Sequence, residues 1–240
     1  MKKGLSRREF LKVSTAAGAV LAAGSAIVPS GPGVPLVEDA CKDCGDDLNP
    51  IPVTRPPASG NHPLLQLLMK RSSSRSFSTD PLPKEVLSNL IWAAFGINRS
   101  DSGRRTAPSA SNRQEIDLFV AMAEGLYVFD AKAGFLVPLV AEDIRARTGR
   151  QPFVKEAPVN LVYVADLSRM STVAKEDQEF YSAADAGFIS ENVYLYCAAE
   201  GLATVVRGLI DRPALAKAMG LRPDQKILLA QSVGYPRKGS

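Results

Sequence analysis

The feature that most constrains the fold is a long helical run in the C-terminal half of the chain, at about 177–200. Its apolar residues fall on nearly every side of a helix, which predicts a buried helix rather than a surface one. Gly201 follows the run, as is typical of a helix end. Other elements must therefore surround this helix. The apolar and small positions in it are Ala183, Ala184, Ala186, Gly187, Phe188, Ile189, Val193, Leu195 and Cys197.

The rest of the chain mixes helical and strand patterns without strict alternation. The expected elements are helices at 63–70, 83–95, 142–147 and 213–219, strands at 116–123, 126–130, 135–140, 160–165, 203–206 and 226–233, and a polar loop at 98–105. The run at 160–165 is continuously apolar, which is typical of a central strand. Mixed elements of this kind favour an α+β fold over a doubly wound one.

The first 30 residues have the organisation of an export signal. Arg7 and Arg8 are followed by Phe10, Leu11 and Lys12, then by a weakly apolar run rich in Ala and Gly and by small residues suited to cleavage. The paired arginines resemble a twin-arginine signal, which predicts delivery to the periplasm by the twin-arginine export machinery. The apolar run is short for a membrane span, so cleavage is favoured, and permanent anchoring stays open.

The signal also explains the basic charge of the chain. The net charge is +4, and residues 1–30 hold five basic residues against one acidic residue. Residues 31–240 are therefore close to neutral. Nucleic-acid binding requires a clustered basic face on the folded domain, so the overall charge is no argument for it.

A linker rich in Pro and Gly is expected at 31–60, before a folded domain at 61–240. The linker holds Cys41 and Cys44, which in an oxidising compartment form a small disulfide loop or remain free thiols. No metal site is predicted, because structural zinc needs four ligands and there is no second cysteine pair. His62 is the only histidine, which argues against His-based metal sites and a Ser-His-Asp triad.

A basic, hydroxyl-rich stretch follows the first helix of the expected domain. Arg71 and Arg75 lie on either side of three serines. A guanidinium offers a planar fork of donors and a serine adds a short hydroxyl donor, a combination that suits a phosphate. The same residues would also suit a solvated cap at the C-terminus of a helix, so this stretch alone does not decide between the two.

Four segments, in the same order along the chain, resemble motifs of the nitroreductase family. Residues 71–77 resemble its opening motif with Arg and Ser, and residues 108–114 resemble its Pro-Ser-Ser-x-Asn-x-Gln segment. Residues 201–208 are similar to the segment that runs under the flavin ring, and residues 234–238 to the C-terminal signature. The resemblance covers about residues 61–238.

This resemblance implies a nitroreductase-like α+β fold with a central mixed sheet flanked by helices. It also implies a homodimer with the long buried helix at its interface, and a non-covalent FMN in each of two interface sites. Residues 90–96 look especially like the subgroup that includes azoline-oxidising dehydrogenases.

The resemblance further implies a set of cofactor-binding residues. Those expected around the phosphate and ribityl chain are Arg71, Ser72, Ser73 and Arg75, completed by Arg237 and Lys238. Those expected to line the isoalloxazine are Pro108, Ser109, Ala110 and Asn112 from the partner subunit, with Val206, Arg207 and Gly208 beside the ring.

Two positions depart from the family pattern. Ala110 stands where the family has a second serine, and Arg207 stands where many members have an acidic residue. An arginine beside the flavin could stabilise its anionic reduced form.

The implied activity is two-electron transfer at flavin N5 to or from a small organic substrate, such as a nitro compound, a quinone or a C=N bond. No side chain is expected to act as a nucleophile, because the cofactor carries the reaction. NAD(P)H is the usual donor in the family but is scarce outside the cytoplasm, so we expect a quinol, another reductase or an organic substrate. Three alternatives stay open: a flavin-binding protein or electron carrier without turnover, a periplasmic module that binds another anion, and a surface-interaction protein anchored by an uncleaved signal.

Overall fold

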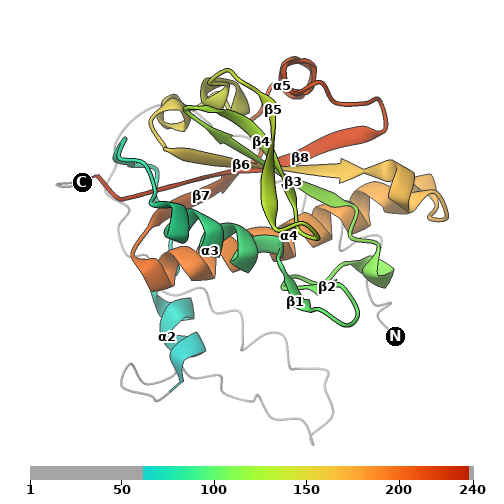
Figure 1. Ribbon diagram of the computed structural model, residues 1–240, viewed down its shortest axis with the longest axis horizontal. Coiled ribbons are helices and arrows are strands. Elements are labelled where there is room, and N and C mark those ends of the chain that lie inside the picture. The colour runs from blue at the N-terminus through green and yellow to red at the C-terminus, as the bar shows by residue number, and fades with distance from the viewer. Residues whose placement is uncertain (1–61, 238–240) are drawn as a thin grey trace, which may run out of the picture. The chain divides into compact units, whose positions relative to one another are not determined.

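A computed structural model describes residues 62–237 of the chain. The expected export signal, the linker with Cys41 and Cys44, and Lys238 lie outside the described residues. Figure 1 shows a sheet with helices on both of its faces. No helix among residues 62–237 is long and apolar enough to cross a membrane.

The sheet has six strands in the order β5-β4-β3-β6-β8-β7. The strands are β3 (Ile116–Met122), β4 (Gly125–Asp130), β5 (Phe135–Val140), β6 (Val159–Asp166), β7 (Ala203–Arg207) and β8 (Gln225–Gly234). All eight residues of β6 are buried, as its continuous apolar character predicts for a central strand. We expected a mixed sheet, and each neighbouring pair of strands in it runs antiparallel.

Two helices, α3 (Lys84–Phe95) and α4 (Lys175–Glu200), cover one face of the sheet and pack on each other (Figure 1). Helix α4 ends at Gly201, which adopts the left-handed conformation with φ of 68°. Within the chain α4 is buried along one side only, although the sequence predicts burial nearly all round. Phe180 and Phe188 are 68% and 50% exposed, so a second apolar side of the helix is left open.

The opposite face of the sheet is covered by α5 (Arg212–Met219) and by the short helices η2 (Arg145–Thr148) and η3 (Pro152–Lys155). A separate apolar cluster forms there, around Phe119, Ile144 and Leu215. Helix α2 (Pro63–Lys70) packs against α4 and has no buried residue. His62 occupies its N-cap position without a side-chain hydrogen bond.

The α+β fold with a sheet flanked by helices is therefore confirmed, and the main helices and strands fall within a few residues of their predicted bounds. Two local predictions differ. The expected loop at 98–105 contains the short pair β1 (Ile97–Arg99) and β2 (Arg104–Arg105). The expected helix at 142–147 is the 3₁₀ turn η2, which begins three residues later. Two further 3₁₀ turns are η1 (Ala110–Asn112) and η4 (Leu167–Met170).

Candidate functional site

The basic stretch after α2 runs beside the edge strand β7. The Ser74 N–H donates to the Thr204 carbonyl at 2.9 Å, and Phe77 pairs antiparallel with Pro236 of the C-terminal segment. Phe77 is fully buried, with its ring centroid 5.7 Å from that of Phe153. Residues 71–77 are therefore fixed between β7 and the C-terminal segment, as the order of the sequence motifs requires.

Tyr194 of α4 joins this stretch to β7. Its hydroxyl lies 2.8 Å from the Ser73 hydroxyl and accepts the Val206 N–H at 3.0 Å. The guanidinium of Arg71 lies over its ring, 5.3 Å from the centroid, at a distance typical of cation–π contacts. Sequence reasoning missed Tyr194. The available signal was a tyrosine in an apolar helix, because a buried tyrosine hydroxyl usually finds a hydrogen-bond partner.

Three arginines gather around this stretch. Arg75 is exposed and forms no ion pair with any of residues 62–237, and Arg71 has no carboxylate partner there either. Arg237 forms an ion pair with Glu156 at 2.6 Å and donates to the Phe77 carbonyl at 3.3 Å. Two positive charges at this end of the domain are thus left without a countercharge, next to the exposed serines 72 and 73.

The segment around residues 108–114 forms a second group. The Ala110 N–H donates to the Asp185 carboxylate at 2.9 Å, and the Ser109 hydroxyl accepts the Gln114 N–H at 3.0 Å. Ser111, Asn112 and Gln114 all have positive φ, between 52° and 53°. Consecutive non-glycine residues in this region are strained and occur mainly at functional sites. Pro108 and Asn112 are exposed on this loop.

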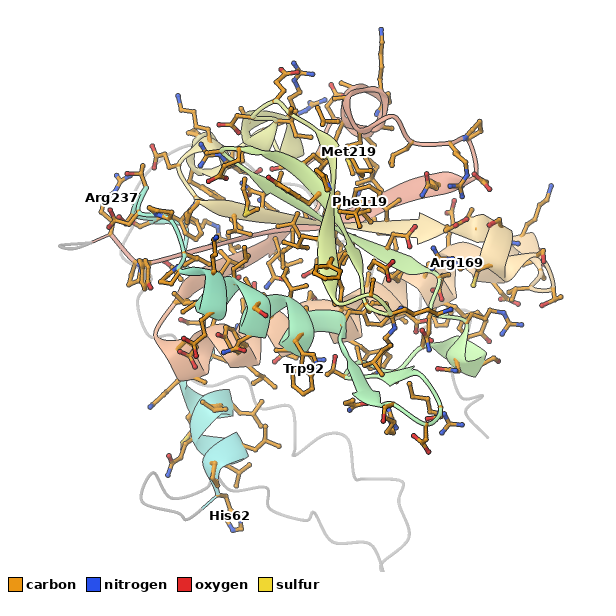
Figure 2. All side chains as sticks on the ribbon, in the orientation of Figure 1. His62, Trp92, Phe119, Arg169, Met219 and Arg237 are labelled. Atoms are coloured by element: carbon orange, nitrogen blue, oxygen red, sulfur yellow. The ribbon has the colours of Figure 1, made fainter. Side chains whose placement is uncertain are left out.

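Within one chain the two groups lie apart. The first contacts α4 at Tyr194 and the second at Asp185, nine residues earlier, which corresponds to about 13 Å along the helix. Figure 2 shows Arg237, from the first group, and Arg169, which donates to the Gln114 carbonyl, toward opposite ends of the domain. The structure therefore does not bring residues 108–112 to Arg71 and Ser73 of the same chain.

The Arg207 side chain does not join either group. It lies in the interior, where it donates to the Thr148 carbonyl and hydroxyl, to Asn160 Oδ1 and to the Ser232 hydroxyl. Burial lowers the pKa of Arg207 to about 10, and the guanidinium has no carboxylate partner among residues 62–237. Its donors are used to hold η2, β6 and β8 together, so a direct contact from this side chain to a ligand is not what the structure shows.

The next residue, Gly208, is exposed and lies at the end of β7. A Cβ added there would meet only Leu229 Cδ2 at 3.8 Å and Arg212 Nη2 at 4.0 Å, which are ordinary contacts. The protein itself therefore does not require glycine at this position.

Comparison with known proteins gives the family. The model of the nitroreductase family matches residues 68–235, which is more than half of the chain and includes both groups of residues. The chain belongs to the nitroreductase family.

Individual nitroreductase relatives agree. Two of them carry the description "putative nitroreductase". The protein of Methanocaldococcus jannaschii is 28% identical over 155 residues, or 60% of this chain and 78% of that protein. The crystal structure of the Ralstonia eutropha protein is 43% identical, with a TM-score of 0.71, over 78% of this chain and 89% of that one. The NADPH:FMN oxidoreductase of Vibrio harveyi, solved with NAD⁺, shares the fold at 20% identity and a TM-score of 0.54, over 74% of this chain and 70% of that one.

Proposed function

We propose that this nitroreductase is an FMN-dependent oxidoreductase that acts on a small organic substrate. The observation that carries the proposal is the pair of arginines, Arg71 and Arg75, that have no countercharge among residues 62–237 and lie beside serine hydroxyls at the edge of β7. A dianionic phosphate supplies the missing countercharge and accepts charge-assisted hydrogen bonds from both side chains.

The residues present fit FMN. Arg71, Arg75 and the hydroxyls of Ser72 and Ser73 would hold the phosphate and the ribityl chain. Arg237 would add a further charge, because its backbone is fixed beside residues 76 and 77. The expected contribution of Lys238 belongs to the same shell. The family relative from Vibrio harveyi is described as an FMN oxidoreductase, which supports the same cofactor here.

The isoalloxazine would lie beside Val206, Arg207 and Gly208, where β7 ends and Gly208 leaves room for close approach. The Val206 N–H already bonds to Tyr194, so it is not the donor that faces the ring. The Arg207 guanidinium is engaged in the interior, so this residue would contribute through its backbone. We therefore do not assign Arg207 a direct contact with the reduced flavin.

We further propose that a second copy of the chain supplies Pro108, Ser109, Ala110 and Asn112 to this site. The two groups are about 13 Å apart along α4 in one chain. The open side of α4 carries Phe180, Tyr181 and Phe188, all exposed, and exposed apolar patches of this kind mark interaction surfaces. A homodimer that covers this side would bury the patch and complete each site.

FMN supplies, when bound, the acceptance and donation of a hydride at N5. The chain's own residues bind the phosphate, orient the ring and exclude water from one side of it, and no side chain is needed as a nucleophile. The substrate class would be a nitro compound, a quinone or a compound with a C=N bond. For a protein exported by the twin-arginine route to the periplasm, the donor would be a quinol or a partner reductase rather than NAD(P)H.

The test is the absorption spectrum of the purified full chain, followed by identification of the small molecule that heating releases. We expect a yellow protein that releases FMN. The double variant R71A/R75A is expected to lose most of the flavin. The matched control K132A/R147A also removes two exposed positive charges, but from the β4–β5 turn and from η2, and is expected to keep it.

Each other outcome has a meaning. A colourless protein that binds inorganic phosphate would favour the periplasmic anion-binding module. A protein that holds FMN but is reduced by no donor and reduces no acceptor would favour the electron carrier without turnover. Full flavin occupancy in R71A/R75A would show that the proposed phosphate site is wrong.

A further inference from the structure

Two carboxyl groups are buried together beneath the loop at 108–114. Glu115, which follows the loop, is 0% exposed, and Asp185 of α4 is 3% exposed. Neither Glu115 oxygen makes a hydrogen bond within residues 62–237, and the buried Ser182 hydroxyl on the same side of α4 also lacks a partner there. Asp185 accepts the Ala110 N–H at 2.9 Å. A buried carboxyl group without donors is costly when it is ionised.

The charges around the pair do not neutralise it. Arg169 of η4 pairs with Asp117 and Asp166 and donates to the Gln114 carbonyl. Arg105 of β2 donates to Gln114 Oε1 and to the Phe95 carbonyl. Neither of these arginines forms an ion pair with Glu115 or Asp185. The only ionisable group that faces each carboxyl closely is therefore the other carboxyl.

Burial raises the pKa of Glu115, and the negative charge of Asp185 raises it further. Burial also raises the pKa of Asp185, although the Ala110 N–H opposes that shift. Two adjacent acids in such a site titrate as a unit, and the first proton is held much more tightly than the second.

We propose that Glu115 and Asp185 share one proton, and that this proton holds the loop at 108–114 in its strained conformation. With the proton on Glu115, Asp185 is the only anion and keeps both the Ala110 N–H and the neutral carboxyl as partners. Loss of the proton leaves two buried anions side by side. Their repulsion is relieved when Asp185 moves off the Ala110 N–H or when the loop opens.

The direction of the pH dependence follows. Folding raises the pKa of this pair, so its contribution to loop stability is complete at acidic pH, below the ordinary carboxyl pKa of about 4. The contribution is lost as the pH rises through the raised pKa of the folded state. The loop is also the segment proposed to line the isoalloxazine, so flavin affinity should weaken over the same range. This last step rests on the proposed function, whereas the step concerning the loop does not.

The experiment compares hydrogen exchange of residues 106–114 in the flavin-free full chain with the same measurement in Glu115→Gln. The amide introduced by this substitution is neutral at every pH and can still donate to Asp185. Comparison at matched pH cancels the intrinsic pH dependence of exchange. We expect the ratio of the wild-type to the variant exchange rate to rise by about tenfold per pH unit across the titration. Glu124→Gln, an exposed acid of the β3–β4 turn, should follow the wild type.

A second variant, Asp185→Asn, removes the neighbouring charge but keeps an oxygen that accepts the Ala110 N–H. It should move the midpoint to lower pH without abolishing the response, which a purely structural role of Asp185 would not do. Identical profiles for wild type and Glu115→Gln, or an unshifted midpoint in Asp185→Asn, would refute the shared proton. A pH-dependent loop in a chain that binds no FMN at any pH would support the shared proton and refute the proposed cofactor.

Discussion

At the scale of single residues, the candidate site depends on Tyr194 as much as on the arginines. Its hydroxyl bonds to Ser73 and to the Val206 N–H, and its ring lies under Arg71. One side chain of α4 thus sets the distance between the proposed phosphate site and the end of β7. This role depends on contacts between residues more than a hundred positions apart, which no local pattern reveals.

Tyr194→Phe should separate these contacts. The ring remains under Arg71, but the Val206 N–H and the Ser73 hydroxyl lose their partner, which typically costs about 1 to 2 kcal/mol of unfolding free energy. Flavin affinity should fall by about tenfold, because about 1.4 kcal/mol corresponds to a factor of ten. Denaturant unfolding and quenching of FMN fluorescence measure the two effects. The control is Tyr196→Phe, whose hydroxyl bonds to the Val86 carbonyl instead. Equal losses of flavin affinity in both variants would contradict the role of Tyr194.

At the scale of elements, the sequence predicts well whatever depends on local periodicity. The helix at 63–70 has its predicted bounds, and the hairpin of β4 and β5 and the central strand β6 are where the apolar pattern places them. The pair β1–β2 was not predicted, because two polar strands of two or three residues carry no periodic signal. The side-chain direction of Arg207 could not be read either, since its acceptors come from three separate elements.

The turn between β7 and α5 allows folding and binding to be tested separately. Gly208→Ala should leave the unfolding free energy within about 0.5 kcal/mol, because the added Cβ meets only ordinary contacts at 3.8 and 4.0 Å. It should weaken FMN binding, because the methyl group occupies the space proposed for the ring. In Gly149→Ala the added Cβ would lie 2.3 Å from Arg207 Nη1, so that variant should lose stability itself. Denaturant unfolding of the flavin-free variants and FMN titration distinguish the two effects. A Gly208→Ala chain with wild-type FMN affinity would show that the ring lies elsewhere.

At the scale of the whole molecule, the open side of α4 links assembly to cofactor binding. The sequence predicts a helix buried nearly all round, yet one chain buries only one side of it and leaves Phe180, Tyr181 and Phe188 exposed. The residues proposed for one flavin site are also divided between two places in the chain. Both observations are explained if a second copy covers this side, so dimer formation and flavin binding should be lost together.

Phe188→Asp tests this link. A charge in the centre of the proposed interface should shift the chain from dimer to monomer, because a buried unpaired carboxylate costs several kcal/mol. The flavin content should fall in parallel, although every proposed phosphate ligand is intact. Light scattering after size exclusion gives the mass, and the absorbance ratio gives the occupancy. Phe135→Asp is the matched control, since Phe135 is 68% exposed on the edge strand β5 and should affect neither quantity. A monomeric Phe188→Asp chain with full flavin occupancy would mean that each site is completed within one chain. In that case residues 108–112 would have to reach the flavin from the same subunit, across the separation along α4 seen here.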